Sequence, residues 1–322
     1  MLAALLALPS PARADAVRDA ARLARGIKVL GYDPLWFDPA KARFQPRHFA
    51  RIRAGGFSHI RMPMFGFAHM DADNRLDPRW LVTLDRMVAD ATASGLAVIL
   101  DEHDFNACGR DLPACRSRLL AFWQQVALRF RSAPDTVLFE ILNEPNRAVT
   151  PDAWNALLAE ALAAIRQTNP ARTVVIGPGN SNSYRSLPAL ELPEADRNIV
   201  VTVHYYEPSA FTYQGAGWAN PGRENDVGRN WGAEAERAAV GAAFDQVAAW
   251  GRVHNRPMHL GEFGAYDKGP AGSRAEWTAA VARAAEARGM SWSYWQFDHD
   301  FLAYDMARDD WIAPIHDALV PW

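Results

Sequence analysis

The chain has 322 residues, 49% of them apolar, and a formal net charge of -3. This size and composition fit one domain with a large core, within the range of an α/β barrel. Arg is mixed with Asp and Glu along the chain, which argues against a nucleic-acid or anionic-membrane partner, since both require a basic face. A neutral substrate is expected, with no metal or other cofactor.

Residues 1–14 have the pattern of a secretory signal peptide. The apolar run of residues 1–8 is followed by two prolines and the small-x-small tripeptide Ala12-Arg13-Ala14, a typical cleavage site. The run is too short to span a bilayer, and the alternative is an ordinary N-terminal helix. Cleavage after Ala14 leaves residues 15–322 as one domain without a membrane segment. We expect this domain to be secreted or periplasmic and monomeric.

Short runs rich in Val, Ile and Leu alternate with longer amphipathic segments, a pattern typical of βα units around a parallel sheet. About eight such units close a (β/α)8 TIM barrel. Prolines at positions 46, 78 and 151 mark helix starts, whereas residues 180–198 show little helical periodicity. The expected strands are residues 28–33, 58–62, 97–102, 137–143, 173–177, 199–205, 258–263 and 291–296.

The only cysteines, Cys108 and Cys115, lie close together in a segment that contains Gly and Pro. In an oxidising compartment such a pair suits a local disulfide, and the alternative is two free thiols. A disulfide here would fix a loop beside His103. Lysine occurs only at Lys28, Lys41 and Lys268, and we interpret this scarcity as codon bias rather than function.

Polar residues gather at the carboxyl ends of the expected strands, the face that carries the active site of such barrels. Glu144 and Glu262 each interrupt an apolar run, and a carboxylate held where a buried strand ends suits acid/base or nucleophilic chemistry. We therefore predict a carboxylate pair at one mouth. The residues at these strand ends are Arg61, His103, Asn143, Glu144, His204, Tyr206, Glu262 and Trp295.

Six motifs in barrel order carry a family resemblance: His59-Ile-Arg61-Met-Pro63, Leu100-Asp-Glu-His103, Phe139-Glu-Ile-Leu-Asn143-Glu144-Pro145, Val203-His204-Tyr205-Tyr206-Glu-Pro208, Gly261-Glu262-Phe263-Gly264 and Tyr294-Trp295-Gln-Phe297. The set resembles glycoside hydrolase family 5 over nearly all of the chain after residue 27. The resemblance implies a barrel with its acid/base at the end of strand four and its nucleophile at the end of strand seven. It also implies an endo-acting β-glycanase, most often active on cellulose, mixed-linkage glucan or mannan.

Roles for the site residues follow from this resemblance. It implies retention by double displacement, with Glu262 as nucleophile and Glu144 as general acid and then general base. Glu144 must therefore begin protonated. The implied supporting roles are donors to Glu262 for Arg61 and Tyr206, a bond to the sugar 2-hydroxyl for Asn143, orientation of Glu144 for His204, and a bond to a sugar hydroxyl for His103.

Aromatic rings at an open cleft are the expected sugar-binding elements, because sugar rings present apolar C–H faces. Tryptophans inside expected helices, such as Trp80, are instead expected to pack in the core. The predicted platforms at the mouth are Trp295, Trp36, Phe65, Trp218 and Trp231.

Each assignment has a structural alternative. Asn143-Glu144-Pro145 could be a strand end followed by a helix start, Arg61 a structural ion-pair partner, and both histidines satisfied polar groups of the core. The chain also departs from the family pattern. Asp104 follows His103 where many relatives have a second histidine, and the first strand lacks the asparagine-containing loop common among cellulases.

We expect a retaining endo-β-1,4-glycanase, most readily an endoglucanase acting on cellulose or mixed-linkage β-glucan, with an endo-β-mannanase as the alternative. A metal-dependent hydrolase using Asp101, His103, His204 and Glu262 is a rival, but no HxH or HExxH pair supports it. A non-catalytic carbohydrate-binding barrel is a second rival, against which the presence of both glutamates counts.

Overall fold

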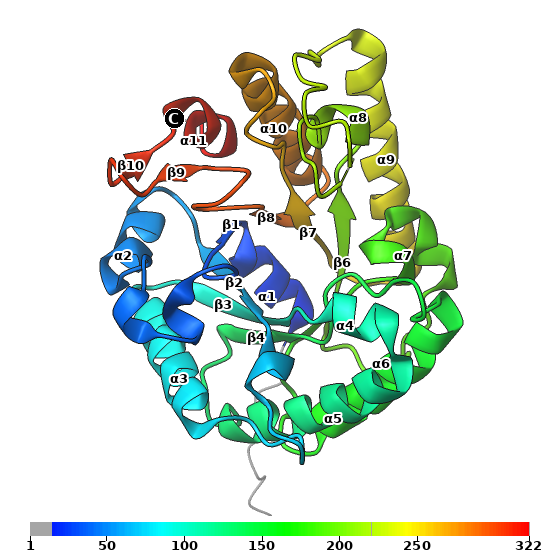
Figure 1. Ribbon diagram of the computed structural model, residues 1–322. Coiled ribbons are helices and arrows are strands. Elements are labelled where there is room, and N and C mark those ends of the chain that lie inside the picture. The colour runs from blue at the N-terminus through cyan, green and yellow to red at the C-terminus, as the bar shows by residue number, and fades with distance from the viewer. Residues whose placement is uncertain (1–14, 220, 322) are drawn as a thin grey trace, which may run out of the picture.

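The computed structural model describes residues 15–219 and 221–321. Eight parallel strands close a barrel in the order β1 to β8, and helices surround it on the outside (Figure 1). The predicted (β/α)8 barrel is therefore confirmed. The predicted signal peptide, residues 1–14, lies outside the described residues.

The barrel strands largely follow the predicted runs, and β3, β6 and β7 have the predicted bounds. The first strand does not, because it ends at Lys28 and the chain turns at Leu30, whose φ is 70°. Lys28 thus stands at the carboxyl end of its strand, paired in register with Arg61. The strands are β1 (Arg25–Lys28), β2 (His59–Met64), β3 (Ala97–Glu102), β4 (Val137–Glu140), β5 (Val174–Ile176), β6 (Ile199–Tyr205), β7 (Met258–Phe263) and β8 (Ser291–Tyr294), with a two-stranded sheet of β9 (Tyr304–Asp305) and β10 (Asp310–Trp311).

Several helices begin where the sequence predicts, with proline as the first residue of α2, α3 and α6. Residues 180–198 contain only short helical pieces. No helix in the described part of the chain is long and apolar enough to cross a membrane. The helices are α1 (Ala16–Leu23), α2 (Pro46–Ala54), α3 (Pro78–Ala93), α4 (Phe105–Arg110), α5 (Leu112–Arg129), α6 (Pro151–Arg166), α7 (Gly179–Asn182), α8 (Ser209–Thr212), α9 (Glu234–Val253), α10 (Ala271–Glu286) and α11 (Ala313–Leu319), with 3-10 turns η1 (Pro34–Trp36), η2 (Pro39–Lys41), η3 (Gly66–His69) and η4 (Tyr184–Ala189).

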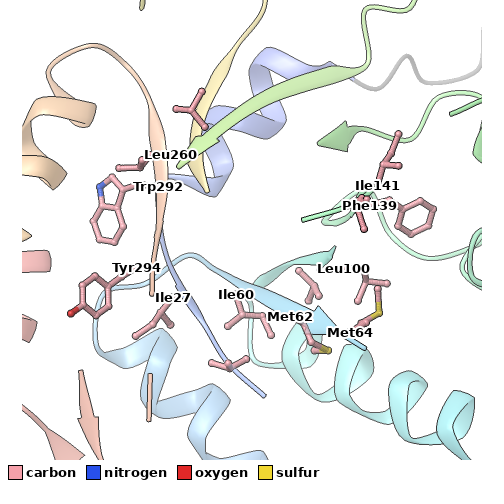
Figure 2. Close-up of a cluster of buried hydrophobic side chains, with 14 of the residues drawn as sticks. Ile27, Ile60, Met62, Met64, Leu100, Phe139, Ile141, Leu260, Trp292 and Tyr294 are labelled. Atoms are coloured by element: carbon pink, nitrogen blue, oxygen red, sulfur yellow. The ribbon is translucent and has the colours of Figure 1, made fainter. Parts of the chain in front are cut away.

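The main hydrophobic core lies between the strands and the surrounding helices. Strand residues such as Ile27, Ile60 and Phe139 contribute to it (Figure 2). Helix tryptophans pack against the other side of the strands, as predicted, and two of them donate their indole N–H to backbone carbonyl groups. Trp123 donates to the carbonyl of Ile141 at 2.9 Å and Trp154 to that of Gly177 at 2.8 Å.

The inside of the barrel is divided into layers of different polarity. Helix α1 closes the amino-terminal end, and its Leu23 belongs to an apolar cluster with inward-facing strand residues such as Ile99 and Val200. Above this cluster, the Ser293 hydroxyl lies 2.7 Å from His59 Nε2 and 3.1 Å from that of His259. The cluster of buried charged side chains follows at the carboxyl ends of the strands, and Asp19 of α1 is a buried carboxylate at the other end.

Cys108 of α4 and Cys115 of α5 form a disulfide bond, with their Cα atoms 4.6 Å apart. It joins the two helices that follow β3. Phe105 at the start of α4 lies 5.4 Å, between ring centroids, from His103. The disulfide therefore ties down the segment that borders His103.

Gly26 is required by the close approach of β1 to the His59 ring. A Cβ at Gly26 would lie 2.1 Å from ring atoms of His59, and that ring is held by Leu23 O and Ser293 Oγ. Gly26→Ala should therefore lower the free energy of unfolding by about 1–3 kcal/mol through overpacking. Thermal denaturation should show a midpoint several degrees lower.

Gly272 in the first turn of α10 provides the matched control, because a Cβ there meets nothing within 4 Å. Gly272→Ala should leave the midpoint unchanged or raise it slightly, given the better helix propensity of alanine. Equal midpoints for the two variants would contradict the packing argument.

Candidate active site

A cavity of about 410 Å³ opens at the carboxyl ends of the strands. It brings together most of the residues predicted from the strand ends, including both glutamates. Its lining consists of Tyr32, His103, Phe105, Asn106, Asn143, Glu144, Tyr206, Tyr213, Trp218, Glu262, Trp295, His299, Asp300 and Phe301.

A β-bulge in β7 turns Glu262 into the barrel. On the β6 side, Val203 pairs with Leu260 and the next residue, His204, pairs with Glu262, so Gly261 is an extra residue. Bulges of this kind re-aim side chains near active sites. A Cβ at Gly261 would lie 2.3 Å from the Thr202 hydroxyl oxygen, so the bulge depends on glycine.

Glu262 is almost fully buried and is surrounded by donors. Lys28 Nζ and Arg61 Nη1 both donate to Oε1, the latter at 2.8 Å, and the Tyr206 hydroxyl donates to Oε2 at 2.9 Å. Burial alone would raise the pKa of Glu262, but the charges of Lys28 and Arg61 hold that pKa well below its usual value. Glu262 is therefore an ionised carboxylate.

Glu144 follows β4 in a backbone conformation with φ of 42°. Its side chain is 20% exposed, compared with 5% for that of Glu262. His204 Nδ1 lies 2.8 Å from Glu144 Oε1, and Asn182 Nδ2 lies 3.2 Å from His204 Nε2. Because an amide nitrogen can only donate, Nε2 accepts and the Nδ1 proton points at Glu144. Oε2 of Glu144 remains for a ligand.

The two glutamates share one small space. A carboxylate oxygen from each, together with a ring nitrogen of His204, lie within 4.8 Å of one another. By distance alone these three atoms could hold a metal ion. However, Lys28 and Arg61 already place two positive charges on Glu262, and a further cation would be repelled.

Arg61 connects Glu262 to the neighbouring strands. It forms a bidentate pair with Glu140, both bonds at 2.6 Å, and donates to Asn143 Oδ1 at 2.9 Å. Arg61 Nη2 also lies 3.1 Å from Asp101 Oδ2. Burial disfavours its charge, yet Asp101 and Glu140 raise the pKa of Arg61 above its usual value. Arg61 is thus both an ion-pair partner in the barrel and a donor to Glu262.

His103 is held as a neutral ring. Its Nδ1 lies 2.6 Å from Asp101 Oδ2, and burial lowers the pKa of His103 well below its usual value. Nδ1 therefore donates to Asp101, which leaves Nε2 as an acceptor. The ring stacks against Trp295 with centroids 5.8 Å apart and planes 9° from parallel.

The predicted aromatic platforms separate into two groups. Trp295 and Trp218 line the cavity, and Trp218 is 61% exposed. The peptide bond after Trp295 is cis. Phe65 is half-buried at the border, with its centroid 5.2 Å from that of His103.

The prediction that Trp36 and Trp231 are binding platforms is wrong. Trp36 turns inward in η1, donates to the carbonyl of Leu30 at 2.7 Å and packs on Trp80. Trp231 is 4% exposed and lies just before α9, beneath the guanidinium of Arg237. Their ring faces are covered by the protein.

Sequence reasoning missed several residues of the site. Lys28 is the most consequential, because scarce lysine indicates only codon bias and the apolar run predicts a strand that begins at Lys28, whereas β1 ends there. Asn182 was missed because it comes from the irregular segment after β5. Tyr32 and Tyr213 line the cavity from loops. In the sequence, only their aromatic side chains and their positions near strand ends indicate a role in the site.

Comparison with known proteins agrees with this geometry. The family model described as Cellulase (glycosyl hydrolase family 5) matches residues 24–300. Endoglucanase H of Acetivibrio thermocellus is 29% identical over 266 residues, which cover 80% of this chain and 28% of that protein. Endoglucanase A of Clostridium longisporum is 27% identical over 292 residues, covering 85% of this chain and 54% of that protein. The chain thus spans only part of the length of these relatives.

Solved structures match along their whole length. Endoglucanase Cel5A of Thermotoga maritima is 35% identical with a TM-score of 0.89, covering 95% of this chain and 100% of that one. Cellulose synthase subunit Z of Clostridioides difficile is 32% identical with a TM-score of 0.87, covering 92% and 99%. The chain belongs to glycosyl hydrolase family 5, the cellulase family.

Proposed function

We propose that this protein is a retaining endo-β-1,4-glucanase that cleaves cellulose or mixed-linkage β-glucan by double displacement. The observation that carries the proposal is the approach of the Glu144 and Glu262 carboxylate oxygens to within 4.8 Å in opposite surroundings. Retaining glycosidases hold their carboxyl groups about 5–5.5 Å apart, whereas inverting enzymes leave about 6.5–9.5 Å for a water molecule. The observed spacing favours direct attack by one carboxylate.

In the first step, Glu262 attacks the anomeric carbon while Glu144 protonates the departing glycosidic oxygen. The donors on Glu262 suit the nucleophile, because they keep it ionised. The hydrogen bond from His204 occupies Glu144 Oε1, so Oε2 is the oxygen that carries the proton. In the second step, Glu144 takes a proton from water, which attacks the anomeric carbon and releases Glu262.

The neighbouring side chains fit sugar hydroxyl groups. Arg61 fixes Asn143 Oδ1, so the Asn143 NH2 group faces the ligand as a donor for the sugar 2-hydroxyl, a bond that strengthens in the oxocarbenium-like transition state. His103 Nε2, held neutral, accepts from another hydroxyl. Trp295 and Trp218 offer apolar faces to the sugar rings.

The choice of β-glucan rests on the relatives, several of which are endoglucanases. Thermotoga maritima Cel5A has been solved with cellobiose and with mannotriose, so β-mannan is the second substrate to test. Reducing-end release from carboxymethylcellulose, barley glucan, glucomannan and galactomannan distinguishes these substrates.

We also propose that the enzyme is secreted or periplasmic and that cleavage follows Ala14. Asp15 caps α1 by accepting from the backbone N–H groups of Val17 and Arg18. Cleavage at that point would leave the helix that closes the barrel intact. Amino-terminal sequencing of the exported protein checks this proposal.

Removal of either glutamate should severely reduce hydrolysis of the polymer, and the two variants should differ in their activity on aryl glycosides. Glu262→Ala removes the nucleophile and should eliminate turnover of every glycoside. Glu144→Ala should lower activity on polymer by about 10²–10⁴-fold and retain part of the activity on aryl cellobiosides, whose leaving groups need little protonation. Glu191→Ala, at an exposed glutamate, is the control. Wild-type rates for both active-site variants on polymer would refute the proposal.

Trp218→Ala should weaken binding of the polymer. Loss of an exposed aromatic platform of this kind costs about 0.5–1.5 kcal/mol, so KM should rise several-fold with little change in kcat. The control is Phe37→Ala, since Phe37 is 74% exposed and lies outside the cavity. An unchanged KM for the polymer would exclude Trp218 from the substrate site.

Chelation should leave the activity intact. The positive charges on Glu262 disfavour a metal at Glu144, His204 and Glu262, so overnight dialysis against EDTA should not lower the rate on polymer. Loss of activity that added Zn²⁺ or Mn²⁺ restores would instead support the metal-dependent rival.

A further inference from the structure

Lys28 is a buried cation directly beside the nucleophile. It is the last residue of β1, and its side chain is fully buried. Nζ donates to Glu262 Oε1, lies 3.9 Å from Asp101 Oδ2, and stands 3.8 Å above the ring centroid of Trp295. A lysine is buried in this way only where it is paired, so its position calls for a function.

The donors on Glu262 are distributed unequally between its two oxygens. Lys28 and Arg61, both cations, bind Oε1. Oε2 accepts only from the neutral hydroxyl of Tyr206 among the hydrogen bonds of the described residues, and it lies 3.7 Å from His204 Nδ1, the nitrogen that also contacts Glu144. Oε2 therefore faces the space between the two glutamates.

We propose that Lys28 is a positioning residue that, together with Arg61, fixes Oε1 of Glu262, selects Oε2 as the attacking oxygen and stabilises Glu262 as the departing carboxylate of the second step. This proposal rests on the proposed retaining mechanism. It assigns a task to a residue outside the predicted set of site residues.

The positive charge of Lys28 affects the two chemical steps differently, because Glu262 loses its negative charge in the first step and regains it in the second. When Oε2 bonds to the anomeric carbon and the glycosidic C–O bond breaks, Glu262 becomes a neutral ester. When water attacks the anomeric carbon, its proton goes to Glu144, the bond to Oε2 breaks and the electron pair returns to Glu262. A fixed cation at Oε1 stabilises the carboxylate more than the ester, so it favours the second step and restrains the first.

The charge of Lys28 is present over the working range of the site. Burial and the nearby Arg61 lower the pKa of Lys28 to about 8, while Glu262 and Asp101 oppose the shift. Lys28 is therefore protonated below about pH 8 and helps to hold Glu262 ionised down to acidic pH. The titratable groups that face the Lys28–Glu262 pair are Tyr32 after β1, Arg61 on β2, Asp101 and His103 from β3, Glu140 and Glu144 from β4, and His204, Tyr206 and Tyr213 from β6 and its loop.

The first test is the pH dependence of kcat/KM on an aryl cellobioside. Lys28→Met removes the charge and the donor, so the acid limb, which reports ionisation of Glu262, should move to higher pH by about one unit or more. Lys28→Gln retains a donor without the charge and should show a shift of the same sign. Lys41→Met, at a lysine that is 75% exposed, should give the wild-type profile.

The second test separates the two chemical steps. A fluorinated aryl cellobioside with a dinitrophenyl leaving group traps the glycosyl-enzyme, and its formation and decay can be timed by intact-protein mass. Decay should be slowed about tenfold or more in Lys28→Met, corresponding to a shift of one unit in the basicity of the departing carboxylate. Trapping should not be slowed at a pH where Glu262 is ionised in both proteins, because the cation restrains the first step.

The outcomes distinguish this proposal from the proposed function. If the wild type forms no adduct on Glu262, the retaining mechanism fails. If it forms the adduct but folded Lys28→Met and Lys28→Gln keep the wild-type acid limb and decay rate, only the role of Lys28 is refuted. Should Lys28→Met fail to fold, the same two measurements on Lys28→Gln decide the question, and wild-type values overturn the proposal.

Discussion

The active end of this barrel is organised by one requirement, that a buried carboxylate remain charged. Taking Glu262 out of water costs several kcal/mol unless opposite charges and donors replace its hydration. Lys28, Arg61 and Tyr206 supply that replacement. Arg61 is itself buried and needs Glu140 in turn. Each buried charge therefore requires an opposite charge on another strand. This requirement explains why so many charged side chains lie together at the carboxyl end of the barrel.

The layering of the barrel interior follows from the same requirement. Charged groups at the carboxyl end must be kept from solvent on their inner side, and an apolar layer sealed by Leu23 of α1 does this. Between the two lies a hydrogen-bonded layer in which Ser293 links His59 and His259. Burial lowers the pKa of both histidines, so this layer adds no further charge beneath Arg61.

The sequence predicts what depends on local pattern and misses what depends on partners distant in the chain. Alternation and apolar runs locate β3, β6 and β7 to the residue, and motif order brings Glu144 and Glu262 to one face. Side chains of successive strand residues point to opposite faces of a sheet. Because His259 and Gly261 face the barrel interior, a regular β7 would turn Glu262 outward. Only the bulge, visible in the pairing with β6 and β8, reverses it. Lys28 was missed for a related reason, since the end of β1 is set by the turn at Leu30.

The division of labour between the glutamates is fixed by position rather than by residue type. Glu262 lies on β7 and accepts hydrogen bonds from two cations, Lys28 and Arg61. Glu144 lies four residues beyond the last residue of β4 and is more exposed, and it contacts His204, whose ring is oriented by Asn182. Cations at Glu144 would prevent it from holding a proton, and their absence from Glu262 would let that carboxylate take one up. Reversal of the two roles would thus require moving Lys28 and Arg61, which are anchored in the barrel wall on β1 and β2.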